Sequence, residues 1–391
     1  MLTKRVAMGL TSIGLFSGIG GIEEGLRRSG HKGLLLCEID KSARMVLAER
    51  FPDVPILKDV RTIKKLPQVD IWTAGFPCQD LSQAGQTKGI QGAKSRLVAE
   101  LFRLLRTSKH KPKWLILENV PFMLSLAKGR AMSFVVNRLE ELGYQWAYRI
   151  IDTRAFGLPQ RRRRVIIVAS KIEDPRGVLF ADAVDTTLHE NAFDDPCGFY
   201  WTEGLTGLGW AVNAVPPLKG GSSLGIPSPP AIWYPSKRFI GTPDIRDAER
   251  LQGLPANWTS AAADENTARN VRWRLVGNAV SAPVLEWIGD RLERPGEYDD
   301  KEDELLRRGD RWPRAAWGRK GKAYTSQVSE WPVRKKYKEL SKFLNFNAIP
   351  LSERATAGFL SRALRSQLTM DKRFLKDVEY HLKQMKKDIY L

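Results

Sequence analysis

The sequence predicts an α/β fold with a mostly parallel sheet, a smaller loop-rich domain and a basic, helical C-terminal extension. As far as residue 170, short apolar runs alternate with stretches of helical apolar spacing, which is the pattern of βαβ units. This periodicity then gives way to Gly, Pro, Ser and aromatic residues, and Lys and Arg become frequent past residue 294. The expected parts are a first domain at 1–170, the loop-rich domain at 171–240, a return segment completing the first domain at 241–293, and the extension at 294–391.

Each element is expected from its own apolar pattern. The strands of the first domain are expected at 12–16, 33–38, 70–73, 114–118, 148–152 and 165–169. The helices between them are expected at 22–29, 42–51, 96–108 and 130–142. Later helices are expected at 243–253, at 282–292 after a turn at Gly277-Asn278, and, in the extension, at 353–368 and 371–387.

Composition narrows the class of partner. The chain has 391 residues, 42% of them apolar, so it can bury a large core and is not disordered throughout. Its formal charge of +19 favours a polyanionic partner, with nucleic acid as the leading candidate. Residues 311–391 contribute strongly to this charge, with 19 Lys and Arg against 7 Asp and Glu.

The sequence also indicates a compartment. No run approaches the roughly 18 consecutive apolar residues of a membrane-spanning helix, so no membrane partner is expected. The basic start at Lys4-Arg5 leads into a stretch interrupted by Gly and Ser, which argues against a secretory signal. Three cysteines give no disulfide framework and favour a reducing, cytoplasmic location. Four scattered histidines lack zinc-site spacing, so no metal is expected.

A glycine-rich loop lies between the first expected strand and helix, with the sequence Phe16-Ser17-Gly18-Ile19-Gly20-Gly21. Glycines let the backbone turn tightly beside a ligand, and a helix N-terminus favours negative charge. Glu38, at the end of the next strand, is placed to bind ribose hydroxyls. The G-x-G-G spacing differs from the G-x-G-x-x-G of dinucleotide sites and favours a mononucleoside. The alternative is a tight turn without a ligand.

A cysteine follows the strand that is expected to end at Thr73, in the sequence Pro77-Cys78-Gln79. Ligands of parallel sheets bind at the carboxyl ends of the strands, so the thiol is placed to reach one. A thiolate is a good nucleophile, and basic neighbours or a helix N-terminus lower its pKa. The alternative is a buried structural thiol, against which the flanking Pro and Gln argue.

Two further motifs end or begin expected strands. Glu118-Asn119-Val120 ends a strongly apolar strand, where a carboxyl could protonate or hydrogen-bond a substrate nitrogen; the alternative is a helix N-cap. Gln160 and the four arginines 161–164 precede the last strand. Such a run is usually a solvated face or contacts phosphates, but alternate side chains could point into a site and bind a carbonyl oxygen.

In order and spacing, these four motifs resemble the bacterial type of the DNA (cytosine-5-)-methyltransferase family, over about residues 12–170 and 240–290. Further matches to the family are Asp59-Val60, Ser95-Arg96-Leu97, residues 249–255 and residues 277–280. The resemblance implies a Rossmann-like class I methyltransferase fold. It also implies transfer of a methyl group from S-adenosylmethionine to C5 of a cytosine in duplex DNA, with S-adenosylhomocysteine as the product.

The resemblance implies roles for the catalytic residues. Cys78 would add to C6 of the cytosine while Glu118 assists at N3, so that C5 becomes nucleophilic. Arg164 would hold the O2 atom, and Arg162 would support the catalytic loop or the base. The target cytosine must leave the duplex first, because the thiol cannot reach C6 in a stacked base pair.

The resemblance also implies a cofactor pocket. Its residues would be Phe16, Ser17, Gly18, Ile19, Gly20, Gly21, Glu38, Ile39, Asp59, Val60, Pro77, Leu97 and Asn278. Phe16 would lie against the adenine, Glu38 on the ribose and Asp59 on the adenine amino group. Gly14 departs from the family, which usually has an acidic residue there, and this weakens an expected support of the loop.

Residues 171–240 take the place of the family's target-recognition domain, and residues there could read base edges in the major groove. The expected partners are double-stranded DNA and a cognate restriction endonuclease, with a monomeric enzyme acting in a restriction-modification or related defence system. The extension has two interpretations: phosphate contact, or a helical cap whose aromatic residues pack against the core. Those aromatic residues are Trp312, Trp317, Trp331 and Tyr337.

Three other functions are weighed. A transfer RNA substrate, as in one branch of the family, is disfavoured by the separate recognition region and the basic extension. A DNA-binding module without activity is disfavoured by the intact set Cys78, Glu118, Arg162 and Arg164. A base deaminase requires P-C-x-x-C, and the residue three after Cys78 is Leu81.

Overall fold

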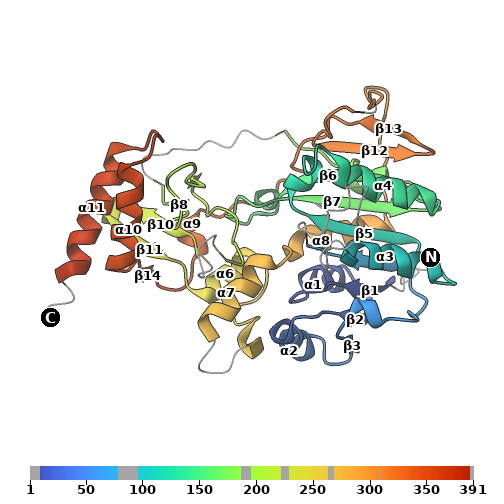
Figure 1. Cartoon of the computed structure of the whole chain (residues 1–391), viewed down its shortest axis with the longest axis horizontal. Coiled ribbons are helices and arrows are strands. Elements are labelled where there is room, and N and C mark those ends of the chain that lie inside the picture. The colour runs from blue at the N-terminus through green and yellow to red at the C-terminus, as the bar shows by residue number, and fades with distance from the viewer. Residues whose placement is uncertain are drawn as a thin grey trace, which may run out of the picture. The chain divides into compact units, whose positions relative to one another are not determined.

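The computed structural model describes residues 9–77, 96–185, 195–221, 229–262, 268–307 and 309–387. They form two compact units, each assembled from separate stretches of the chain (Figure 1). The large-sheet unit comprises Met1–Ala155, Arg163–Asp185 and Val280–Val333. The small-sheet unit comprises Phe156–Arg162, Thr186–Ala279 and Arg334–Leu391.

The large-sheet unit is built on nine strands in the order β13-β12-β6-β7-β5-β4-β1-β2-β3. Their bounds are β1 Thr11–Leu15, β2 Lys32–Cys37, β3 Ile56–Leu57, β4 Ile71–Ala74, β5 Trp114–Asn119, β6 Gln145–Asp152, β7 Arg163–Ser170, β12 Ala315–Arg319 and β13 Lys322–Thr325. All run in one direction except β7 and β12, which are antiparallel to their neighbours. The prediction of an α/β fold with a mostly parallel sheet is confirmed.

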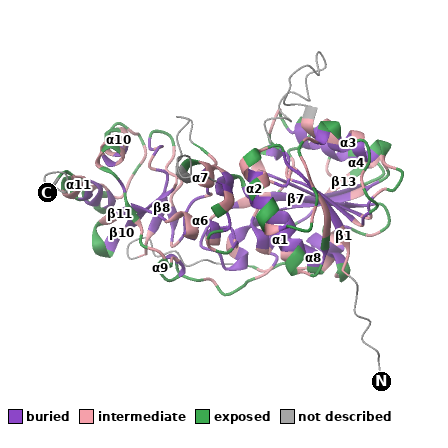
Figure 2. Cartoon of the chain, turned by 90° about the horizontal axis from the view of Figure 1, so that it is seen from below, coloured by how far each residue is buried: buried purple, intermediate pink, exposed green. Residues whose placement is uncertain are grey.

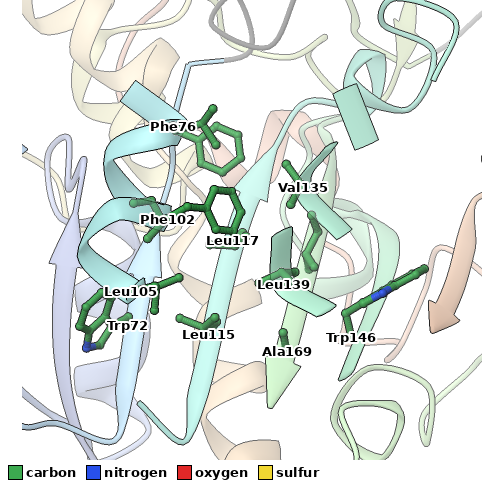
Figure 3. Close-up of a cluster of buried hydrophobic side chains, with 14 of the residues drawn as sticks. Trp72, Phe76, Phe102, Leu105, Leu115, Leu117, Val135, Leu139, Trp146 and Ala169 are labelled. Atoms are coloured by element: carbon green, nitrogen blue, oxygen red, sulfur yellow. The ribbon is translucent and has the colours of Figure 1, made fainter. Parts of the chain in front are cut away.

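Helices cover both faces of this sheet. They are α1 Gly21–Arg28, α2 Lys41–Arg50, α3 Arg96–Thr107, α4 Arg130–Glu141, α5 Arg176–Leu179 and α8 Ala282–Glu293. Side chains of α3 and α4 form one buried cluster with the central strands, in which Phe102 lies beside Leu117 and Leu105 lies beside Trp72 (Figure 3). Helix α1 lies against α8, and a Cβ at Gly25 would stand 2.5 Å from the carbonyl oxygen of Ala282. That glycine therefore lets the two helices approach closely.

Burial explains why these strands form. All six residues of β5 and all four of β4 are buried, as expected for central strands covered on both faces. The part of the sheet around β7 is likewise coloured mostly as buried in Figure 2. The six strands and four helices expected for this part of the sequence lie within three residues of their expected bounds. No helix among the described residues is long and apolar enough to span a membrane.

The small-sheet unit has an antiparallel sheet in the order β14-β11-β10-β8-β9. Its strands are β8 Cys197–Phe199, β9 Ala211–Val212, β10 Ala231–Tyr234, β11 Phe239–Thr242 and β14 Ile349–Pro350. Its helices are α6 Ile245–Leu251, α7 Ala268–Asn278, α9 Leu340–Phe343, α10 Glu353–Leu364 and α11 Lys372–Lys387. The expected turn at Gly277-Asn278 is instead the last part of α7.

The C-terminal segment is not a separate extension beginning at residue 294, because the two units share it. Strand β12 pairs with β6 of the large sheet, and β14 pairs with β11 of the small one. Phe359 of α10 and Phe374 of α11 are 1% and 0% exposed and pack on Phe199 at ring-centre distances of 5.0 and 5.1 Å. The structure thus supports the interpretation in which the aromatic residues of this segment are part of the core.

The four aromatic residues named for that interpretation have defined contacts. The Trp312 ring meets the Trp146 ring edge-on at 5.9 Å, and Trp317 stacks on Tyr324 at 4.4 Å. Trp331 is 7% exposed. The Tyr337 hydroxyl donates to the carbonyl oxygen of Asn213 at 2.5 Å.

Candidate active site

One edge of the large sheet gathers most of the motifs. Because β1, β2, β4 and β5 are parallel, their carboxyl ends meet there. The glycine loop follows β1, Glu38 follows β2, Pro77 follows β4 and Glu118 lies in β5. Strand β7 runs the other way, so its first residues, Arg163 and Arg164, reach the same edge.

The glycine loop has the backbone that its sequence predicts. Phe16, Gly18 and Gly20 all have positive φ, of 59°, 57° and 83°. The Ser17 N–H donates to the carbonyl oxygen of Cys37 in β2, and the Gly20 N–H donates to that of Ser17. A Cβ at Gly18 would meet nothing within 4 Å, so the loop leaves open space at that point.

Glu38 holds the loop to the end of β2. It is 9% exposed, and its Oε2 accepts from the Gly18 N–H at 2.7 Å while Oε1 accepts from the Asp40 N–H at 2.8 Å. Beside it, the Ile39 side chain is 60% exposed. Ile39 and half-buried Phe16 thus offer apolar surface next to carboxylate oxygens, which is a combination that suits a nucleoside.

The remaining expected pocket residues of this unit differ in their exposure and contacts. Asp59 caps the turn that begins at Val60 and pairs with Arg61, whose guanidinium lowers the pKa of the Asp59 carboxyl. Val60 is buried and Leu97 is half-buried, whereas Pro77 is exposed. Ile19 is also buried and so belongs to the interior of the unit. Gly21 closes the loop onto the segment before α8, because a Cβ there would overlap the carbonyl oxygen of Val280.

Cys78 lies outside the described residues, but the other two cysteines are described. Burial raises the pKa of the Cys37 thiol to about 12, which makes it a poor nucleophile at neutral pH. Cys197 is fully buried in the aromatic core of the small-sheet unit. Neither of these thiols is suited to attack a substrate, which leaves Cys78 as the candidate nucleophile.

Glu118 and Arg164 form an ion pair in which the Arg164 Nε is 2.9 Å from the Glu118 Oε1. The register of the sheet explains the pair. Glu118 lies opposite Ile166, and Arg164 is two residues before it on the same face of β7. Both side chains are largely buried, with 11% and 16% exposure. A carboxyl and a guanidinium held together at this edge can recognise a ring nitrogen and its adjacent carbonyl oxygen.

Asn119 has a function that the sequence did not reveal. Its Nδ2 donates to the carbonyl oxygen of Phe76 at 3.0 Å, and its Oδ1 accepts from the Val120 N–H at 2.9 Å. The side chain therefore ties the end of β5 to the chain two residues before Cys78. It is not the N-cap considered above, since the short helix that follows has Val120 as its N-cap. Its position directly after Glu118 is the one signal that could have indicated this role.

Arg162 does not share the surroundings of Arg164. It is 1% exposed within the small-sheet unit, and its guanidinium donates to the carbonyl oxygens of Leu218, Gly277 and Ala279 at 2.9, 3.2 and 2.5 Å. Through these hydrogen bonds Arg162 joins the segment at Leu218 to the segment at 277–279. Asn278 also belongs to this unit, at the exposed end of α7.

The neighbouring motif residues are structural too. The Gln160 Nε2 donates to the carbonyl oxygen of Leu251, and its Oε1 accepts from the Leu218 N–H. Glu249, fully buried, accepts from the Thr259 N–H and from Arg272. These hydrogen bonds fasten the end of α6 to the segments around it.

Comparison with known proteins identifies the family of the chain. Residues 10–193 match the family model of the C-5 cytosine-specific DNA methylase. The chain is 50% identical over 367 residues to the Type II methyltransferase M2.BsuMI of Bacillus subtilis (strain 168), covering 90% of this chain and 93% of that protein. It is 30% identical over 305 residues to the Type II methyltransferase M.NgoBI of Neisseria gonorrhoeae, covering 70% and 90%.

A solved structure shows the same fold. The S. pombe Dnmt2 methyltransferase superposes with a TM-score of 0.53 at 16% identity, over 73% of this chain and 98% of that one. Fold and site thus define an α/β enzyme with a glycine loop and an acid–arginine pair at one sheet edge. The chain belongs to the C-5 cytosine-specific DNA methylase family and is a DNA (cytosine-5-)-methyltransferase.

Proposed function

We propose that the protein is the methyltransferase of a Type II restriction-modification system, and that it methylates C5 of a flipped cytosine in a short duplex sequence through a covalent bond from Cys78. The pairing of Glu118 with Arg164, beside the segment that leads to Cys78, is the observation that carries this proposal. The names of the two relatives support the restriction-modification setting. A cognate endonuclease acting on the same site is therefore the expected second partner.

The residues at the edge would divide the chemistry between them. The Cys78 sulfur forms a bond to C6 of the cytosine, and the electron pair of the C5–C6 double bond moves toward C5. Glu118 assists by hydrogen bonding or donating a proton at N3, and Arg164 holds both Glu118 and the O2 atom. After C5 has gained the methyl group it loses its proton, and the electron pair of that C–H bond re-forms the double bond as the C6–sulfur bond breaks.

S-adenosylmethionine would supply the methyl group as an electrophilic sulfonium. The residues that would hold it are those around the glycine loop, where Glu38 provides carboxylate oxygens and Phe16 and Ile39 provide apolar surface. Asp59, Val60 and Leu97 would complete the pocket on its far side. The open space at Gly18 is consistent with a ligand approaching the backbone there.

Duplex DNA is the proposed substrate, and the small-sheet unit is proposed to read it. This unit includes residues from both the region 186–279 and the segment after Arg334, so both can contribute to recognition. Arg238 and Arg373 are among the basic residues around a surface hollow on this unit and are candidates for phosphate contacts.

Labelled methyl transfer from S-adenosylmethionine to duplex DNA and to transfer RNA tests the proposal. We expect label only in DNA, at C5 of one cytosine within a short sequence by bisulfite sequencing, and none with Cys78→Ala. Label confined to transfer RNA would show that the substrate is RNA and would leave the proposed reaction unchanged. No label in either would contradict the proposed activity.

A further inference from the structure

Glu23 is a buried acid that the proposed chemistry leaves unused. It lies in the first turn of α1, directly after the glycine loop, and is 6% exposed. Among the described residues, neither of its carboxyl oxygens has a hydrogen-bond partner of ordinary geometry, and the Ser17 hydroxyl has none either. Burying an acid without well-formed hydrogen bonds destabilises the fold, so the presence of Glu23 here calls for an explanation.

The carboxyl of Glu23 occupies space next to Gly14 in β1. A Cβ at Gly14 would overlap the Glu23 Oε1 and stand 2.6 Å from the Ser17 Oγ. The carboxyl and the hydroxyl therefore converge on the volume that a side chain at position 14 would fill. Gly14 is the strand residue two positions before the loop begins, so the carboxyl lies directly behind the loop.

The surroundings of this position keep the Glu23 carboxyl partly protonated at neutral pH in the free protein. Burial raises the Glu23 pKa to about 7, opposed by its own backbone N–H and the Ser17 hydroxyl, and Glu38 adds a smaller rise. Nearby charges on α1 and α8 have partners of their own. These pairs are Glu24 with Arg27 and Arg28, and Glu286 with Arg28.

We propose that Glu23 is a positioning residue for the glycine loop, and that its carboxyl, ionised and acting through Ser17, holds the loop in the form that binds the S-adenosyl cofactor. The inference rests on the cofactor proposed above. An ionised carboxyl behind a helix N-terminus is stabilised by the helix dipole and by any cation that the loop receives. Cofactor binding should therefore release the proton that the free protein holds on Glu23.

Calorimetric titration of the full-length protein with S-adenosylmethionine, in the absence of DNA, tests this directly. With a pKa near 7 in the free protein, affinity should rise about tenfold between pH 6 and pH 8. Titration at pH 6.5 in two buffers of different ionisation enthalpy should show release of about 0.8 proton per cofactor. Glu23→Gln should bind with no pH slope and no proton release, at the weaker affinity.

Two further variants separate positioning from simple packing. Gly14→Asp with Glu23→Ala returns a carboxyl from the opposite side of the same volume, and should bind within about threefold of the wild type, whereas each single change weakens binding by about tenfold. Glu24→Gln is the matched control, since Glu24 is buried on the same helix but paired with arginines. It should keep the pH slope of the wild type.

The outcomes are distinct. Wild-type binding without a pH slope or proton release overturns the role of Glu23 and leaves the proposed function standing. Absence of any binding by the folded wild type overturns the proposed cofactor and this inference together. Should Glu23→Gln fail to fold, the proton count on the wild type decides alone.

Discussion

The two units use their buried polar side chains differently. In the large-sheet unit, apolar strands such as β4 and β5 fill the interior, and the pair Glu118–Arg164 lies at the sheet edge that carries the candidate site. In the small-sheet unit the strands are two to four residues long, and Arg162, Gln160 and Glu249 join its loops through backbone hydrogen bonds. Neighbouring arginines of one motif therefore have different partners: Arg164 meets a carboxylate at the candidate site, and Arg162 meets backbone carbonyl oxygens inside the small-sheet unit.

The largest expected effect is the loss of methyl transfer on substitution of Cys78. Cys78→Ala should reduce methyl transfer by on the order of 10⁴-fold or more, because the covalent step is lost, while S-adenosylhomocysteine still binds. Cys37→Ala is the matched control: its thiol is buried in the core, so it should lower stability and leave methyl transfer measurable. Comparable losses of activity in both variants would contradict the assignment of Cys78.

Next in size is the aromatic core of the small-sheet unit. Phe374→Ala removes a fully buried ring and should lower the free energy of unfolding by about 3–5 kcal/mol, measured by urea denaturation. Leu364→Ala is the control, because this side chain is 65% exposed on the neighbouring helix and should cost less than about 0.5 kcal/mol. A stable Phe374→Ala protein that only bound DNA less tightly would show instead that the C-terminal helices are an appendage.

Substitutions of Arg162 and Arg164 test the difference between the two units most directly. Arg162→Met should destabilise the protein by about 3 kcal/mol, since three carbonyl oxygens lose a charged donor. Arg164→Met should instead reduce methyl transfer by on the order of 10²-fold, with a much smaller change in stability. Urea denaturation and single-turnover kinetics on both variants check this. The reverse assignment of effects would refute the division of labour between the units.

The smallest effect is expected at Arg163. Its side chain is 42% exposed and pairs with Glu330 in the large-sheet unit. Solvent and salt screen such a pair, so Arg163→Ala should change the free energy of unfolding by less than about 1 kcal/mol. Denaturation at low and high salt measures it. A loss of activity without a stability change would point to a role at the site that its ion pair does not indicate.

Most of the large-sheet unit could be predicted because its elements carry their own signals. Strand 114–118 is a continuous apolar run, and helix 130–142 repeats apolar residues at helical spacing. Both are found within one residue of those bounds. Strands β12 and β13 were missed, since they join the sheet beside β6, far away in the sequence.

The site was predicted in part for the same reason. The glycine loop and Glu38 lie within one βαβ unit, where local geometry brings them together. Asn119 and Glu23 were missed because their significance depends on a carbonyl oxygen at Phe76 and on the empty side-chain position at Gly14. A contact of that kind leaves no periodicity in the chain.

By itself the sequence determined the family, the parallel sheet and the candidates Cys78, Glu118 and Arg164, because contiguous motifs and regular apolar spacing encode them. The tertiary structure decided that, of the four consecutive arginines, Arg164 pairs with Glu118 and Arg162 donates hydrogen bonds to backbone carbonyl oxygens. It also decided that the last two helices complete the hydrophobic core of the small-sheet unit, whose first strand begins at Cys197. Both outcomes depend on side chains meeting partners from distant parts of the chain, which only the folded backbone brings together.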